Sequence, residues 1–286
     1  MPHNIVGIDH SLIGVNDLEQ AKSHFRSLGF TITSRGAHIG WGTANYCIMF
    51  DKDYIELLGI INPDIETNGL DVALAERGEG LLGLALASDD PEQTHASMVS
   101  ADLNPSELLQ LKRKLELPDG DVVPEFKLIR LQPAGLSEKQ LFICHHLTPN
   151  LIRNDQWVRH ANGATGIASI VVVVDDPASL AAYYRKLCGF INVTMTDDTL
   201  NVRIGDGALI FVNDKDLDML FPGLYLPADI PALPYMIAMS IAVKDLEATT
   251  SYLNAENINY QEIANGALRI NPADATGVLL EFVQEH

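Results

Sequence analysis

The amino-acid sequence predicts an α+β protein built from four copies of one βαβββ module. Four times along the chain, an apolar strand is followed by a capping residue and then by a helix. Shorter strand-like runs come after each helix. A segment rich in Pro, Asn and Gly, residues 146–164, interrupts the repeat after its second copy. The sequence therefore predicts an N-terminal domain over residues 1–150 and a C-terminal domain over residues 164–286.

The first copy opens with "GIDHSLIGVNDLEQAKSHFRSLGF", residues 7–30. Because side chains alternate along a strand, Ile8, His10 and Leu12 are expected on one face. Either Asn16 or Asp17 can cap the helix that follows. Apolar residues then recur at helical spacing, as expected for a helix with one buried face.

The other three copies open with "LLGLALASDDPEQTHASMV", "GIASIVVVVDDPASLAAYYRKLCGF" and "IAMSIAVKDLEATTSYLNAENI". In the second and third copies, the pairs Asp90–Pro91 and Asp176–Pro177 provide a cap and a proline at the first helical position, where no N–H is needed. The runs "YIELLGI", "QLFICHH", "GALIFVND" and "GVLLEFVQ" are expected to be the last strands of the four modules.

Composition excludes several classes of function. The formal net charge of −19 predicts a surface that repels nucleic acids and acidic membranes, so neither is expected as a partner. No apolar stretch is long enough for a membrane span, and the first residues lack the features of a signal peptide. Three scattered cysteines without CxxC spacing are typical of a cytoplasmic protein.

Glu56 is the charged residue inside the apolar strand "YIELLGI". A carboxylate buried in such a strand is costly unless a positive charge or a metal ion compensates it. Glu56 is therefore a candidate for a metal ligand. An ion pair with Arg35 or Arg153 would also satisfy its charge, as a purely structural contact.

The segments "GIDHSLIGVNDLEQA", "HIGWGTAN" and "YIELLGI" resemble the glyoxalase-like branch of the vicinal oxygen chelate superfamily. This group also includes bleomycin-resistance proteins and extradiol dioxygenases. The resemblance implies that the modules pair into two glyoxalase-like cups, each around a ligand site. It also implies that metal-dependent members take their ligands from the first and last strands of the paired modules.

The resemblance places the first-strand ligand seven residues before the cap, which selects His10 in the first module. Only the first module has a metal-binding side chain at this position. The other modules have Gly83, Ser169 and Ala238 there. On the last strands, Glu56 and Glu281 are available. In "LFICHH" either His145 or His146 can face the cup, and alternation with Phe142 and Cys144 favours His146. The expected metal set is therefore His10, Glu56 and His146.

The same residues have structural alternatives. A single strand histidine such as His10 is often a hydrogen-bonded core residue, and His146 can simply cap the turn that follows it. The C-terminal cup is expected to be ligand-poor, with Glu281 held by a local partner. A second cluster, "HIGWGTAN", either lines the cup or forms an ordinary glycine-rich hairpin. Its expected substrate-binding residues are Trp41, Thr43 and Asn45, together with Tyr54; Glu56 and His38 are the catalytic candidates.

Two functions follow from these expectations. The first is a metal-dependent enzyme, of the isomerase, lyase or dioxygenase type, that acts on a small oxygenated substrate. Fe, Zn, Ni or Mn would each suit two imidazoles and a carboxylate around an open position. The alternative is a metal-free protein that binds and sequesters a small molecule. Beside these two functions, a third alternative is a scaffold whose ligand-poor C-terminal pair of modules provides a surface for a homo-oligomer.

Overall fold

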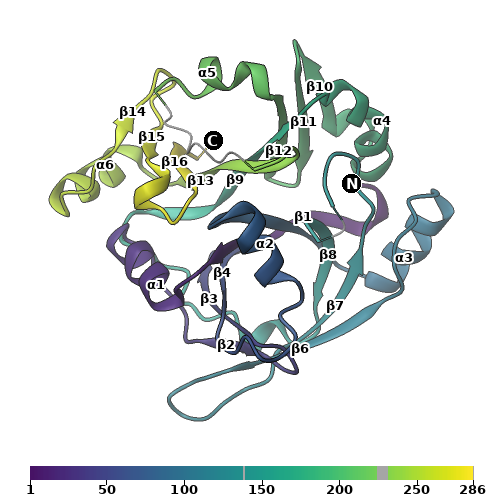
Figure 1. Ribbon diagram of the computed structural model, residues 1–286, viewed down its shortest axis with the longest axis horizontal. Coiled ribbons are helices and arrows are strands. Elements are labelled where there is room, and N and C mark those ends of the chain that lie inside the picture. Colours follow the sequence, from purple (N-terminus) through teal and green to yellow (C-terminus); the bar gives the residue numbers. More distant parts are fainter. Residues whose placement is uncertain (138, 224–230, 286) are drawn as a thin grey trace.

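Two eight-stranded β-sheets flanked by short helices form the chain (Figure 1). The computed structural model describes residues 1–137, 139–223 and 231–285. Each sheet contains two βαβββ modules, so the predicted α+β fold of four paired modules is confirmed.

The first sheet takes its strands from the first two modules. Module one contains β1 (Ile5–Val15), α1 (Leu18–Ser27), β2 (Gly36–His38), β3 (Thr43–Met49) and β4 (Tyr54–Ile60). Module two contains β5 (Gly80–Ser88), α3 (Pro91–Ser100), β6 (Leu109–Leu115), β7 (Glu125–Arg130) and β8 (Leu141–His146).

The second sheet repeats this order. Module three contains β9 (Ala164–Val174), α4 (Pro177–Cys188), β10 (Val193–Thr196), β11 (Thr199–Ile204) and β12 (Gly207–Asn213). Module four contains β13 (Tyr235–Val243), α6 (Leu246–Ala255), β14 (Gln261–Glu262), β15 (Leu268–Ile270) and β16 (Leu279–Gln284). Short 3-10 turns lie at Pro2–Asn4, Pro149–Leu151, Phe190–Asn192, Asp214–Asp216 and Pro272–Asp274.

An aspartate caps the main helix of every module. The Asp17 carboxylate accepts hydrogen bonds from the backbone N–H groups of Glu19 and Gln20, both at 2.9 Å. Asp90, Asp176 and Asp245 cap α3, α4 and α6 in the same way. These bonds satisfy N–H groups that the first turn of a helix leaves free, which explains why the capping residue marks each repeat in the sequence.

Strand pairing closes the first sheet into a barrel in the order β1-β4-β3-β2-β6-β7-β8-β5. β1 runs parallel to β4 and antiparallel to β5, so the two modules meet along β1 and β5. The second sheet pairs β9 with β12 and β13 in the same manner. The residues of the barrel that face inward therefore surround one internal space.

Two further helices were not expected from the sequence. α2 (Leu70–Arg77) joins β4 to β5 and lines the interior of the barrel, whereas α5 (Leu217–Leu220) directly follows the 3-10 turn at Asp214–Asp216. Among the described helices, none has the length and apolarity that a membrane crossing requires.

A bulge in β1 changes which side chains face the barrel. Ile8 pairs with Leu86 and His10 pairs with Ala85, so Asp9 is an extra residue in β1. An extra residue interrupts the alternation of a strand. Ile8 consequently belongs to the main core with Ile13 and packs near Gly207 of β12, whereas His10 faces the cavity. The expectation that Ile8 shares a face with His10 is therefore wrong.

Candidate functional site

The barrel encloses a cavity of about 670 Å³. This volume lies within the range of small-molecule sites, roughly 300–1,000 Å³. Seven of the eight residues singled out in the sequence line it; they are His10, His38, Trp41, Thr43, Asn45, Tyr54 and Glu56. They come from β1 to β4 and the turn between β2 and β3, which the barrel closure brings to one wall.

Glu56 lies at the centre of this wall and is 6% exposed. Its Oε1 accepts a hydrogen bond from Asn45 Nδ2 at 2.5 Å. His10 Nε2 lies 3.6 Å from Oε2, and His38 Nε2 lies 3.7 Å from Oε1. Two imidazoles therefore approach opposite oxygens of one carboxylate, at distances longer than direct hydrogen bonds.

Each histidine is held through its other ring nitrogen. His10 Nδ1 lies 3.3 Å from Asp9 Oδ1, and the ring stacks on Tyr54 with 4.5 Å between centroids. His38 Nδ1 lies 2.9 Å from Thr43 Oγ1, and the Trp41 ring lies tilted beside the imidazole with 5.6 Å between centroids. Within the described chain, neither Nε2 atom has a hydrogen-bond partner. Both nitrogens are thus oriented toward Glu56 and available to a ligand.

Burial and charge set the ionisation of this group. Burial opposes ionisation of Glu56, but His38, His10 and Arg113 outweigh it and hold the pKa of the carboxyl below its ordinary value. Burial lowers the pKa of His38 despite the nearby Glu56 carboxylate. The site therefore combines an ionised carboxylate with a neutral imidazole at neutral pH.

The position of the Asn45 side chain depends on a close approach between β2 and β3. A Cβ atom placed on Gly36 would lie 2.0 Å from Asn45 Oδ1. A side chain at position 36 would therefore displace the Asn45 amide from its present position. The segment "HIGWGTAN" lines the cavity through His38, Trp41, Thr43 and Asn45.

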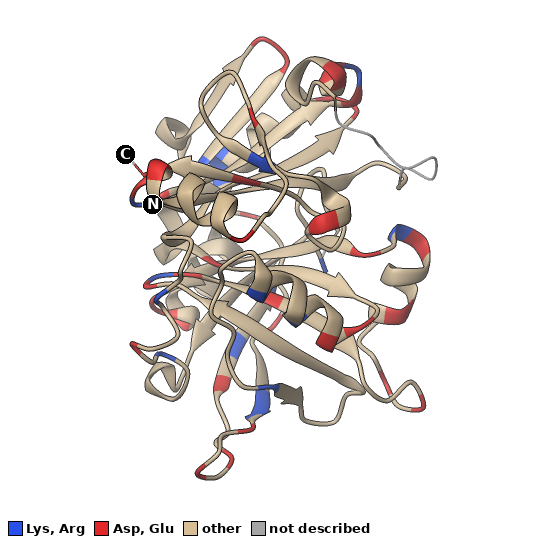
Figure 2. Cartoon of the chain, turned by 90° about the vertical axis from the view of Figure 1, so that its left-hand side faces the viewer, with Lys and Arg blue, Asp and Glu red and all other residues tan. Residues whose placement is uncertain are grey.

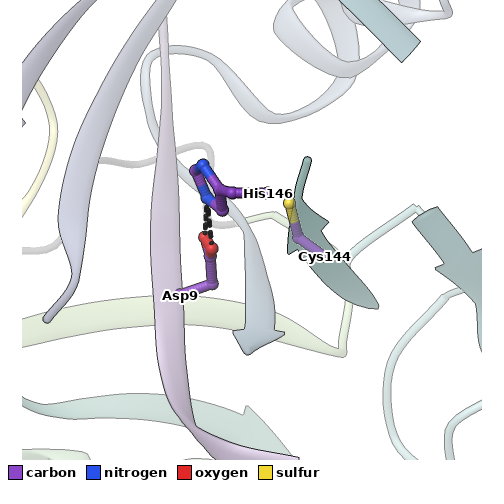
Figure 3. Close-up of side chains that lie close together, drawn as sticks. All are labelled: Asp9, Cys144 and His146. Carbon is purple, nitrogen blue, oxygen red and sulfur yellow. Dashed lines mark hydrogen bonds and ion pairs between the residues drawn. The ribbon is translucent and has the colours of Figure 1, made fainter. Parts of the chain in front are cut away.

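His146 does not join Glu56, although it lies on the Cys144 side of β8 as alternation predicts. Its Nε2 lies 2.7 Å from both carboxylate oxygens of Asp9 (Figure 3). Asp9, Cys144 and His146 are the group of described residues whose ligand atoms all lie within 4.8 Å of one another. The expected three-ligand set of His10, Glu56 and His146 is not assembled, because the β1 bulge places Asp9 in front of His146.

This second group is a buried, hydrogen-bonded cluster. Burial opposes ionisation of Asp9, but His146 and His10 outweigh it and hold the pKa of the carboxyl well below its ordinary value. Burial raises the pKa of Cys144 well above its ordinary value, so the sulfur is a thiol. Asp9 thus links His146 to His10, and through His10 it borders the Glu56 wall.

Sequence analysis missed Arg113 as a site residue. Arg113 is the central residue of the short basic run Lys112-Arg113-Lys114. In the structure the Arg113 side chain is 4% exposed and lines the cavity. Alternation along β6 contained the signal, because Leu109, Leu111 and Leu115 share the face of Arg113.

Arg35, Arg153 and Glu281 each have a local partner in the structure. Arg35 pairs with Glu116, and Arg153 donates to the backbone carbonyl of Asp51, so neither compensates Glu56. In the C-terminal sheet Glu281 accepts from Arg269 at 2.9 Å, as expected for a locally held carboxylate.

A family model described as a glyoxalase-like domain matches residues 8–188, which is more than half of the sequence. The chain belongs to this glyoxalase-like family. It is thereby a member of the vicinal oxygen chelate superfamily, as its motifs and paired modules indicated. The match begins within β1, includes the other seven strands of the closed barrel, and extends through β9 to the end of α4.

Solved structures share the fold of this glyoxalase-like protein at low sequence identity. A hypothetical protein from Staphylococcus aureus has a TM-score of 0.67 and 14% identity, covering 97% of this chain and 99% of that one. A mutant of 4-hydroxymandelate synthase from Streptomyces coelicolor has a TM-score of 0.62 and 15% identity, covering 99% and 93%.

A third structure is a xylose isomerase-like TIM barrel/4-hydroxyphenylpyruvate dioxygenase fusion protein. It has a TM-score of 0.56 and 14% identity, covering 99% of the glyoxalase-like chain and 50% of the fusion. Comparison with curated proteins gave no match. These structures establish the shared fold, and the chemistry has to be argued from the cup itself.

Proposed function

We propose that this protein is a metal-dependent enzyme that acts on a small oxygenated substrate inside the N-terminal barrel. The observation that carries the proposal is the approach of two oriented imidazole nitrogens, from His10 and His38, to opposite oxygens of buried Glu56. His10, His38 and Glu56 would hold the ion. His38 takes the place that the sequence suggested for His146.

The donor types suit a divalent metal, although the ligand atoms of His10, His38 and Glu56 do not all lie within 4.8 Å of one another, so one ion would have to draw these side chains together. Two imidazoles and one carboxylate with open positions suit Fe, Zn, Ni or Mn. Metal ligands must be deprotonated, and the lowered pKa values of Glu56 and His38 favour the forms that bind. Asp9 and Thr43 support the ligand histidines through Nδ1, which is the usual outer-shell arrangement.

A bound ion would supply Lewis-acid stabilisation to neighbouring oxygens of the substrate. The protein side chains have separate tasks. Trp41 and Tyr54 provide flat apolar surfaces, and Thr43 and Asn45 provide polar atoms on the same wall. Glu56 and His38 are the groups that can accept a proton from a substrate held against this wall.

Oxygen-dependent chemistry is one branch of the proposal, and it is supported by the name of one structural neighbour, a 4-hydroxyphenylpyruvate dioxygenase fusion. Isomerase or lyase chemistry is the other branch, because the same donors serve proton transfer beside a carbonyl. Both branches use the same cavity and the same three metal-binding side chains.

A metal-free binding protein is the second candidate, and one observation favours it. Asn45 already donates to Glu56, and the charge of Arg113 also favours the ionised carboxylate. A carboxylate with these partners is stable without an ion. The cavity would then bind a small molecule without transforming it.

Metal analysis separates the two candidates. The wild-type protein, purified without added metal and then reconstituted under anaerobic conditions, is expected to bind one divalent ion per chain. Glu56→Gln should lose that ion. Glu281→Gln, in the C-terminal sheet, is the matched control and should retain it. A wild-type protein that takes up no ion from Fe, Zn, Ni or Mn would contradict the enzyme proposal and support the binding protein.

A further inference from the structure

The cavity has a charge balance opposite to that of the chain. The sequence has 38 acidic and 19 basic residues, and Figure 2 shows acidic positions distributed over both halves. Among the described residues that line the cavity, four are basic and two are acidic. The basic residues are Arg77, Arg113, Arg130 and Lys139; the acidic residues are Glu56 and Glu76. This concentration of cations is local to the cup.

Arg113 is the buried member of this group. Its Nη1 lies 3.2 Å from Cys47 Sγ, and its guanidinium carbon lies 5.6 Å from the centre of the Phe126 ring. Burial raises the pKa of Cys47, so this sulfur is a neutral thiol and a weak acceptor. Arg113 Nε is buried without a hydrogen-bond partner, and Arg113 forms no ion pair within the described chain.

Glu56 does not complete the Arg113 site. Its oxygens face Asn45, His10 and His38, and no ion pair joins Glu56 to Arg113 among the described residues, although Arg113 is the register partner of His38 on the neighbouring strand. A buried guanidinium without a direct anionic partner is costly, because it has lost water without gaining charge-assisted hydrogen bonds. The structure thus leaves a positive, donor-rich position inside a closed apolar barrel.

The other side chains that line the cavity indicate the shape and polarity of the rest of the ligand. Trp41, Tyr54, Phe126 and Phe142 line the same cavity, with several leucines between them. A planar guanidinium matches the two oxygens of a carboxylate. We infer that the cup selects a small organic acid, whose carboxylate binds Arg113 and whose flat apolar body lies among these rings.

This inference deepens the proposed function by naming a substrate class, but it rests only on the ligand entering the same cup. It is tested without metal, because a bound ion would itself attract an acid. Calorimetry on chelator-treated protein compares phenylacetate, phenylacetamide and phenyl phosphate. We expect phenylacetate to bind about tenfold tighter than the amide of the same shape.

Arg113→Met removes the charge and keeps most of the side-chain volume, and it should abolish the preference for the acid over the amide. Arg35→Met, which breaks an exposed pair with Glu116 outside the cavity, is the control and should preserve it. If Arg113→Met does not fold, the comparison of acid and amide binding to the wild-type protein still tests the inferred preference for an acid.

Equal binding of acid and amide, no measurable binding of the acid, or a preference that survives in Arg113→Met would each overturn the inference. Tighter binding of phenyl phosphate would overturn its assignment to carboxylates. A protein that binds no metal but prefers the acid would contradict the enzyme proposal alone. A metal-loaded protein indifferent to the acid group would contradict the present inference alone.

Discussion

His10 Nε2 and Glu56 Oε2 lie 3.6 Å apart on two parallel strands, 46 positions apart in the sequence. The pairing of β1 with β4 produces this approach. Leu12 is the register partner of Glu56, and His10 lies two residues before Leu12 on the same face. The contact therefore depends on the register of the barrel, and a set of substitutions can test what it does.

His10 and His146 are expected to differ in their effect on metal binding. His10→Ala should abolish uptake of a divalent ion, because it removes a nitrogen that faces Glu56. His146→Ala should retain the ion, since the ring faces Asp9 instead. Metal content measured after anaerobic reconstitution checks both variants, with thermal unfolding to establish that each is folded. Loss of the ion in His146→Ala alone would move the site to the Asp9 cluster.

Asp9→Asn is expected to destabilise the protein by about 1–3 kcal/mol. The change weakens the buried charge-assisted contact with His146 and alters the support of His10. Denaturant unfolding gives the free-energy difference. Asp89→Asn, at an exposed position, is the control and should change stability by less than about 0.5 kcal/mol. If Asp9→Asn has the same free energy of unfolding as the wild type, the contacts of Asp9 with His146 and His10 contribute nothing to stability.

Asp53 should make stability depend on pH. Its carboxylate accepts from the backbone N–H of Ile167 at 3.1 Å, and burial raises its pKa to about 7. A raised pKa means that the folded state holds the proton more tightly. The associated stability is fully present below the ordinary pKa of 3.8 and is lost as pH rises through about 7.

Asp53→Asn should therefore gain stability relative to wild type as pH rises from 4 to about 7, by on the order of 1–2 kcal/mol after allowance for its partial exposure. Denaturant unfolding across this range measures the difference. Asp51→Asn, exposed and nearby, should leave the pH profile unchanged. Parallel profiles for Asp53→Asn and wild type would contradict the raised pKa.

Gly36→Ala should disturb the Glu56 wall. Its new Cβ would lie 2.0 Å from Asn45 Oδ1, so the hydrogen bond from Asn45 to Glu56 has to move. We expect a loss of about 1–3 kcal/mol in the free energy of unfolding. Gly7→Ala in β1 is a matched strand glycine, because a Cβ there would meet nothing within 4 Å. Equal stability of the two variants would show that β2 relaxes without cost.

The sequence alone determined the modules and much of the site wall. Each aspartate cap has a local cause, because it binds N–H groups two or three residues further along the chain. Glu56 could be chosen because it is a charged residue inside an apolar strand, and His10 because the family resemblance places a ligand seven residues before the cap. These features depend on neighbours in the chain, and such neighbours are visible in a sequence.

Tertiary structure alone decided which side chains meet. The β1 bulge arises from the pairing of β1 with β5. It places Asp9 beside His146 and directs Ile8 into the main core, away from the cavity. Closure of the barrel brought Arg113 of β6 into the same cavity as Glu56 of β4, although 57 positions separate them. Register and closure are set by packing across whole sheets, so the physical reason for each contact lies outside the local sequence.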